Sequence, residues 1–153
     1  MKTLSIILAL ALFAAIGVAI WVRQIPMPPD TWHRDPQSVA EPDAPMFALR
    51  RGDEAAVIAA PMAEVARRLD AAARADRGRL IAGDLAEGFA TYVVRSRVWG
   101  FPDAVSIRLE TGDEATRVAI FSRSAIGGYD WGANAARVDR WLAAAGADDV
   151  GAP

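Results

Sequence analysis

The chain has 153 residues, a formal net charge of −2 and no cysteine, and 53% of its residues are hydrophobic. This length allows one domain with a modest core, and the lack of cysteine excludes disulfides, thiolate catalysis and zinc–thiolate sites. After residue 23 the acidic residues outnumber the arginines, which opposes binding to the phosphates of nucleic acids. We therefore expect no nucleic acid partner.

The first segment is an apolar run. Residues 4–22 are apolar apart from Ser5, with Lys2 before them and Arg23 after them. A helix of this length spans the roughly 30 Å of bilayer hydrocarbon at about 1.5 Å per residue. A cleaved signal peptide is the alternative, but its small-residue cleavage signals, at residues 15–17 and 17–19, fall inside the apolar run. We predict an uncleaved transmembrane anchor at residues 1–23, with the amino terminus in the cytoplasm and the domain on the other side.

A proline-rich tether is predicted next, at residues 24–46. This segment holds six of the nine prolines and has no helical or strand period, which favours extended, semi-rigid chain. It also contains the only histidine, His33. His33 could be a general base oriented by Asp35, but nearby residues on extended chain point in different directions. We favour the alternative in which Trp32 docks the tether onto the domain or onto the bilayer interface.

Residues 47–146 have the pattern of an α+β domain. Two short strands are predicted around a turn at residues 51–54, followed by a helix that Pro61 opens and Gly78 ends. Alternating segments at residues 80–84, 89–99, 104–110 and 116–124 are separated by breaks short enough for an antiparallel meander. A last helix is predicted over residues 133–145. The expected fold is an antiparallel sheet of four to six strands with two packing helices, helix-grip-like by analogy, between the transmembrane helix and a flexible tail at residues 147–153.

Five arginines occupy strand positions that alternate with the apolar ones. They are Arg95, Arg97, Arg108, Arg117 and Arg123. If each apolar set points to the core, all five lie on the opposite face of one sheet. Such a face could bind an anionic lipid headgroup, a phosphate or the carboxylates of a partner protein. The alternative is an ordinary solvated face, which antiparallel sheets commonly carry.

The stretch "GGYDWGAN", residues 127–134, joins the last predicted strand to the last helix. The glycines that give this corner its backbone freedom are Gly127, Gly128 and Gly132. Asp130 is a candidate N-cap, and Asn134 is predicted on the inner face of the helix. Asp130, Asn134 and Arg137 form either a polar clasp between loop and helix or a small-molecule contact set. We favour the clasp, and expect no catalytic residue or metal site, because no nucleophile or metal-ligand cluster accompanies them.

The pattern G-x-x-D-x-G-x-N-x-x-R is carried here by Gly127, Asp130, Gly132, Asn134 and Arg137. With "RSRVWGFPD" upstream and "WHRDP" in the tether, it resembles the family known as domain of unknown function 1499, found in bacterial membrane-anchored proteins and plant plastids. The resemblance covers roughly residues 47–145, and in the anchored bacterial branch also the tether. It implies a bacterial inner membrane protein with a periplasmic domain, and it implies no activity, because none is established for the family. The chain departs from the family at Ala125, where an arginine is common, and Arg123 is the candidate substitute.

The expected function is that of a non-enzymatic, membrane-anchored envelope module that binds a lipid-like or anionic ligand or a partner protein. The candidate ligand-binding residues are Arg95, Arg97, Arg123, Asp130, Asn134 and Arg137. A hydrolase-type enzyme that uses Asp130 and an arginine is the alternative, which the lack of a paired nucleophile disfavours. No cofactor is expected.

Overall fold

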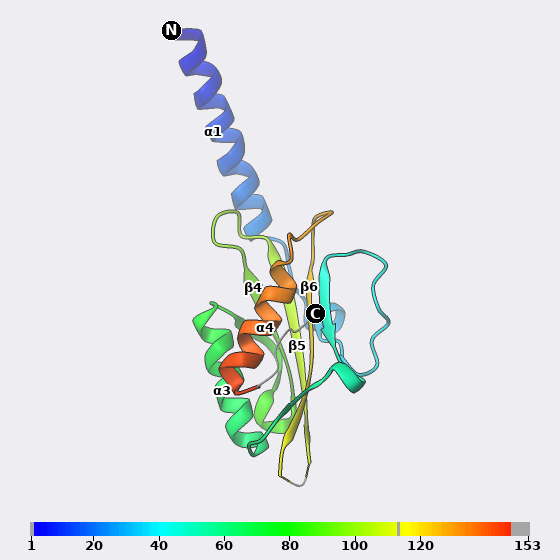
Figure 1. Cartoon of the computed structure of the whole chain (residues 1–153). Coiled ribbons are helices and arrows are strands. Elements are labelled where there is room, and N and C mark those ends of the chain that lie inside the picture. The colour runs from blue at the N-terminus through cyan, green and yellow to red at the C-terminus, as the bar shows by residue number, and fades with distance from the viewer. Residues whose placement is uncertain (1, 113, 148–153) are drawn as a thin grey trace.

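The structure is a computed structural model that describes residues 2–112 and 114–147. A six-stranded antiparallel sheet carries two helices on one face, and a long apolar helix projects from one end of the domain (Figure 1), so the predicted α+β fold class is confirmed. The helices are α1 Lys2–Arg23, α2 Pro29–Trp32, α3 Met62–Ala75 and α4 Ala133–Ala145. The strands are β1 Phe47–Arg50, β2 Ala56–Ile58, β3 Arg79–Asp84, β4 Phe89–Arg95, β5 Pro102–Thr111 and β6 Thr116–Ser124. All of the predicted tail except Ala147 lies outside the described residues.

Strands β3 to β6 form the predicted meander. The sheet order is β1-β6-β5-β4-β3, and β2 also pairs with β6, next to β1 along the same edge. The register is regular across the three central strands, where Tyr92 lies opposite Val105 and Ile107 opposite Ile120. Because directly opposite residues point to the same face, these apolar pairs all lie on one side of the sheet.

The helices α3 and α4 pack their apolar stripes against that side. Val65 and Leu69 of α3 and Val138 of α4 are fully buried in one cluster with the sheet residues. Trp141 meets Tyr92 edge to face, with 6.1 Å between the ring centroids. Full burial of each such side chain contributes about 1.5–3 kcal/mol. These side chains fill the centre of the space between helix and sheet in which helix-grip proteins hold apolar ligands, and an open pocket of about 380 Å³ lies at its edge, between α3 and β3.

The helix α1 is long and apolar enough to cross a membrane. Its most apolar window has a mean hydropathy of 2.6, and 6% of that window is buried. These properties are compatible with a membrane anchor, and a signal sequence near the amino terminus shares them. Its last turn contacts the domain: Val22 is 1% exposed, and Arg23 donates hydrogen bonds to the carbonyl oxygens of Val98 (2.6 Å) and Trp99 (3.0 Å). These contacts fix the end of α1 to the β4–β5 turn.

Residues 25–37 of the proline-rich segment lie along the second face of the sheet. Met27 is buried against Val93, and Trp32 packs against the same small cluster. The ring of His33 stacks on Phe89 with 3.9 Å between centroids. The segment that we expected to be an extended tether therefore follows the sheet, and Trp32 docks on the domain.

Candidate functional site

Four of the five arginines predicted to share a face do share it. Arg95, Arg108, Arg117 and Arg123 occupy strand positions of the same parity, on the face away from α3 and α4. The prediction is wrong for Arg97, because β4 ends at Arg95 and Arg97 lies in the turn that follows. The arginine face is therefore real, but it is smaller than predicted and the proline-rich segment lies on it.

Three of these arginines hold the proline-rich segment, and the first, Arg95, donates a hydrogen bond to the carbonyl oxygen of Ile25 at 2.8 Å. Arg108 forms an ion pair with Asp35, and its guanidinium lies 4.2 Å from the centroid of the Phe89 ring. The buried Arg123 donates a hydrogen bond to the carbonyl oxygen of Trp32 and lies 5.5 Å from the centroid of its ring. Burial, with the charge of another arginine nearby, lowers the pKa of Arg123 to about 10. Ligand binding by Arg123 therefore requires that Trp32 be displaced.

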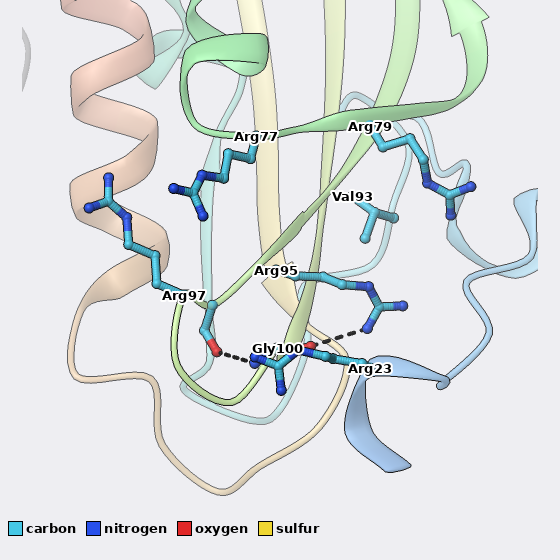
Figure 2. A pocket seen from close by; sticks show the side chains of 8 residues that line it. Arg23, Arg77, Arg79, Val93, Arg95, Arg97 and Gly100 are labelled. Atoms are coloured by element: carbon cyan, nitrogen blue, oxygen red, sulfur yellow. Dashed lines mark hydrogen bonds between the residues drawn. The ribbon is translucent and has the colours of Figure 1, made fainter. Parts of the chain in front are cut away.

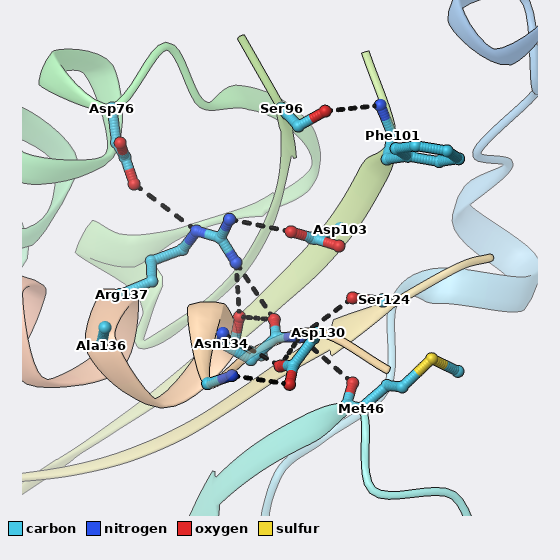
Figure 3. A network of polar contacts seen from close by, with 12 residues as sticks. Met46, Asp76, Ser96, Phe101, Asp103, Ser124, Asp130, Asn134, Ala136 and Arg137 are labelled. Atoms are coloured by element: carbon cyan, nitrogen blue, oxygen red, sulfur yellow. Dashed lines mark hydrogen bonds and ion pairs between the residues drawn. The ribbon is translucent and has the colours of Figure 1, made fainter. Parts of the chain in front are cut away.

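A buried polar network surrounds Asn134 at the start of α4 (Figure 3), where the side chain of Asn134 is 0% exposed. Its Oδ1 accepts hydrogen bonds from Ser122 Oγ at 2.6 Å and from Arg137 at 3.0 Å. Its Nδ2 donates to the carbonyl oxygen of Met46 at 3.1 Å and to Ser124 Oγ at 3.0 Å. One amide thus joins β6, α4 and the residue before β1, so it holds together more than the loop and helix that we predicted for a clasp.

Asp130 holds the loop to the first turn of α4. Its Oδ1 accepts from the N–H of Gly132 at 3.0 Å, and its Oδ2 accepts from the N–H and the side-chain amide of Asn134 at 3.1 and 2.8 Å. Gly132 occupies the N-cap position, so the N-cap prediction for Asp130 is wrong in position, although Asp130 still satisfies a free N–H of the first turn. Burial raises the pKa of Asp130, but hydrogen bonds from Asn134 and Gly132 bring the pKa below its usual 3.8. A carboxylate held in this way is a weak proton acceptor, which disfavours the hydrolase alternative.

Arg137 links this network to β5 and α3. It donates to Asp103 Oδ2 at 2.8 Å and to Ser122 Oγ at 3.1 Å, and its Nε lies 3.5 Å from a carboxylate oxygen of Asp76. Arg137 and Asp103 are both buried, so each charge depends on the other for compensation. The structure brings Asn134 and Arg137 together with internal partners, and these contacts support the clasp interpretation.

Two of the three motif glycines have a backbone conformation that favours glycine. Gly127 and Gly132 have φ angles of 122° and 73°, whereas Gly128 does not have a positive φ. A side chain at Gly127 or Gly132 would strain the corner between β6 and α4.

A second group of residues lines an open pocket beside the end of α1. The pocket has a volume of about 470 Å³, within the usual range for ligand sites. Its lining contains no carboxylate and five arginines, which are Arg23, Arg77, Arg79, Arg95 and Arg97. The other lining residues are Val93, Ser96 and Gly100. In Figure 2 the side chains of Arg79 and Arg95 lie on the same side of β4 as Val93, whereas those of Arg77 and Arg97 lie towards α4. We call this site the arginine pocket.

Each arginine enters the pocket from a different part of the chain. Arg23 ends α1, Arg77 follows α3, Arg79 begins β3, Arg95 ends β4 and Arg97 lies in the β4–β5 turn. Hydrogen bonds to three backbone carbonyl oxygens, at 2.8 to 3.1 Å, fix Arg95 in place. A smaller pocket of about 160 Å³ shares three of these arginines and is also lined by Arg137 and by the carboxylate of Asp76, so the two sites adjoin.

The arginine pocket gathers like charges. Among the residues that the structure describes, Arg77, Arg79 and Arg97 form no ion pair or side-chain hydrogen bond. Burial lowers the pKa of Arg95, and the charges of Arg79 and Arg23 lower it further. Arginine forks bind phosphate or carboxylate oxygens in pairs, so the pocket fits an anion. Within residues 2–112 and 114–147, no three acidic or histidine side chains lie close enough together to hold a metal ion.

The comparison with known families decides the identity of the chain. The profile of the family described as "Protein of unknown function (DUF1499)" matches residues 31–144, which is most of the sequence. The chain belongs to the DUF1499 family. The resemblance seen in the sequence is therefore confirmed. Curated proteins and solved structures give no match to the chain.

The DUF1499 match includes part of the proline-rich segment. It begins at Thr31, so it contains Trp32, His33 and Asp35, which all contact the sheet or its side chains. Of the five pocket arginines it contains all but Arg23, which belongs to α1. The arginine pocket thus forms where the DUF1499 domain meets the apolar helix.

The sequence analysis found Arg95 and Arg97 of this pocket but missed Arg23, Arg77 and Arg79. A usable signal was present, because the triplet Arg77-Gly78-Arg79 marks the junction between a predicted helix and a predicted strand. In a meander, the start of β3 lies beside the end of β4, and Arg79 indeed pairs with Val93. That neighbourhood could have been predicted.

Proposed function

We propose that this DUF1499 protein is a membrane-anchored module that binds a phosphate-bearing anion, the headgroup of an anionic lipid, in the arginine pocket. In this proposal α1 anchors the protein in the bacterial inner membrane. The amino terminus and Lys2 stay on the cytoplasmic side, so the domain lies in the periplasm. The observation that carries the proposal is a pocket lined by five arginines and no carboxylate.

The place of the pocket supports a lipid as the source of the anion. Arg23 is the last residue of α1 and lines the pocket. A bilayer has about 30 Å of hydrocarbon within a total of about 40–45 Å, so each headgroup layer is roughly 5 to 8 Å thick. A pocket that begins at the last residue of a spanning helix lies in or against this layer.

The arginines divide into two groups by their contacts. Arg23 and Arg95 already donate hydrogen bonds to backbone carbonyl oxygens and so form a fixed part of the wall. Arg77, Arg79 and Arg97 have no such partners in the described chain and are available to a ligand. A basic residue close to an anionic membrane surface contributes about 1 kcal/mol to binding.

Lipid retention by the full chain tests the proposal. The chain is placed in nanodiscs of phosphatidylcholine with or without phosphatidylglycerol, and native mass spectrometry counts the lipids that remain bound. The wild type is expected to retain phosphatidylglycerol in preference to phosphatidylcholine. The double variant Arg79→Gln/Arg97→Gln should lose about 1 kcal/mol for each charge, or about 30-fold in affinity for both.

A matched control removes the same charge elsewhere. The variant Arg67→Gln/Arg117→Gln changes two exposed arginines outside the pocket and should retain phosphatidylglycerol as the wild type does. Inorganic phosphate separates the two sources of the anion: displacement of bound lipid by millimolar phosphate would assign the pocket to a soluble phosphate compound instead of a lipid. Equal retention by the wild type and by the pocket variant contradicts the proposal.

A further inference from the structure

We infer that the loops at residues 96–101 and 125–132 insert into the headgroup region of the leaflet from which α1 emerges, and so seat the domain on the bilayer. This inference rests on the membrane anchoring in the proposed function. It adds a second kind of membrane contact, which is apolar and does not need an anionic ligand.

Exposed large hydrophobic side chains concentrate in these two loops. In the described chain after α1, such side chains occur at six positions, and four of the six are in the loops. Val98 is 73% exposed and Trp99 41%, and in the other loop Tyr129 is 61% exposed and Trp131 88%. Tryptophan and tyrosine are the side chains favoured at membrane–water interfaces, because their rings are apolar and their edges can hydrogen-bond.

Both loops lie at the end of the domain from which α1 projects (Figure 1). Arg23 of α1 donates hydrogen bonds to the carbonyl oxygens of Val98 and Trp99, so the first loop is held against the last turn of the helix. The second loop begins at Ala125, whose N–H donates to the carbonyl oxygen of Pro102 at 3.0 Å. The loops are thus neighbours, and a bilayer spanned by α1 lies at the same end.

The backbone of the second loop holds Trp131 outward. Trp131 has a φ of 55°, in the left-handed region that is unfavourable for a bulky side chain, at a cost of roughly 1–2 kcal/mol. The clasp maintains this conformation, because Asp130 accepts hydrogen bonds from the N–H groups of Gly132 and Asn134, on the far side of Trp131. Tyr129 packs edge to face against Trp131 with 5.1 Å between centroids. A fold that stabilises an exposed tryptophan in a strained conformation indicates a binding partner for that side chain.

The bilayer is the occupant that the placement favours. A spanning α1 puts the hydrocarbon directly beyond the residues that the loops expose, and the arginine pocket beside them meets the headgroup layer. Interfacial tryptophan, tyrosine and arginine together are typical of a surface that lies in that layer. A second copy of the chain or a partner protein would have to occupy the space of the membrane.

Site-directed spin labelling of the full chain tests this inference. Because the chain has no cysteine, a single cysteine can be introduced at each position of interest. Val98→Cys and Gly128→Cys report on the two loops, and a Cβ at Gly128 meets no atom within 4 Å. Val57→Cys is the matched control, because Val57 is an exposed apolar residue opposite Arg117, at the other end of β6.

The measurement is made in nanodiscs of pure phosphatidylcholine. Nitroxides at positions 98 and 128 should be more accessible to molecular oxygen, and less accessible to a water-soluble nickel chelate, than the control nitroxide at position 57. Insertion should persist in the Arg79→Gln/Arg97→Gln background, because it does not depend on the anionic ligand. Loop labels that remain as accessible to the chelate as the control, in a chain that is incorporated into discs, overturn this inference alone. A chain that does not enter discs overturns the membrane anchoring and the inference together.

Discussion

Arg77 and Gly146 occupy equivalent positions in the hydrogen-bonded turns that close the two domain helices, α3 and α4. Each has a left-handed backbone conformation, with φ angles of 60° and 99°. In each case the next residue donates its N–H to the carbonyl oxygen of the residue five positions earlier, at 2.7 Å in α3 and 3.0 Å in α4. Glycine is the usual residue here because it has no Cβ to clash. An arginine costs roughly 1–2 kcal/mol at the same position, and that arginine lines the pocket.

The first prediction is that Arg77→Gly stabilises the fold and weakens anion binding. Glycine relieves the left-handed strain, so the free energy of unfolding should rise by about 0.5–1 kcal/mol after the added freedom of the unfolded chain is subtracted. Thermal unfolding of the full chain in detergent micelles measures this change. Arg77→Gln is the control, because it removes the same charge and keeps the strain. Equal stability of the glycine and glutamine variants would show that strain is not the cause.

The second prediction concerns the clasp. Asn134→Ala should destabilise the fold by about 2–4 kcal/mol, because it leaves buried partners on β6 and at Met46 without their hydrogen bonds. Asp130→Ala should cost about 0.5–2 kcal/mol, because the N–H of Asn134 in the first turn of α4 loses its acceptor, as it does when a capping side chain is removed. Unfolding curves at equilibrium measure both. If both variants keep wild-type stability but lose lipid retention, the clasp is a binding site after all.

The third prediction concerns the buried ion pair of Arg137 with Asp103. Asp103→Ala leaves the Arg137 charge buried without this partner, so we expect a loss of about 3–5 kcal/mol. The double variant Asp103→Leu/Arg137→Met replaces the pair with apolar groups and should recover most of that loss. Unfolding of the full chain in micelles measures the two changes. A double variant as unstable as the single one would mean that the other contacts of Arg137 matter more than its charge.

The fourth prediction is that acidification weakens the attachment of the proline-rich segment. Burial lowers the pKa of His33 below 6.5, the charge on Arg108 lowers it further, and Asp35 only partly opposes them. The unfolded chain therefore binds a proton more readily than the folded chain, so stability falls as the pH drops below about 6.5 and levels off below the folded pKa.

His33 is the only histidine in the chain, which makes this test specific. The free energy of unfolding should be lower at about pH 5.5 than at about pH 7.5 in the wild type, and this difference should largely disappear in His33→Gln. The fluorescence of the docked Trp32 gives a local readout. A pH dependence that survives in His33→Gln would point to the carboxylates instead.

Strict alternation made much of the domain predictable from the sequence. The limits of β6 and α4 agree with the prediction because Gly127 and Gly132 interrupt the chain between them and Gly146 ends the helix. The side on which Arg108 and Arg123 lie follows from the same alternation. Arg97 was placed wrongly because the alternation of polar and apolar residues continues in the sequence after the strand has ended. The strand ends there because Ser96 accepts hydrogen bonds from two backbone N–H groups of the following turn and closes that turn.

Contacts between distant segments were less predictable. The proline-rich segment has no period, so nothing in it showed that Met27 would be buried or that His33 would stack on Phe89. The arginine pocket also depends on Arg23 meeting the β4–β5 turn, and that meeting requires the path of the proline-rich segment to be known. Sequence patterns predict elements and faces; they do not predict which non-adjacent segments close a pocket.

Docking of the proline-rich segment limits how far the domain can act. A free proline-rich chain extends about 3.1 Å per residue, so residues 24–46 could otherwise carry the domain about 70 Å from the bilayer. Here residues 25–37 are held against the sheet, and Val22 and Arg23 join α1 directly to the domain. In the proposed arrangement the arginine pocket stays at the membrane surface, where a lipid reaches it by a search in two dimensions instead of three. Any rotation of α1 about its axis would then turn the arginine pocket with it.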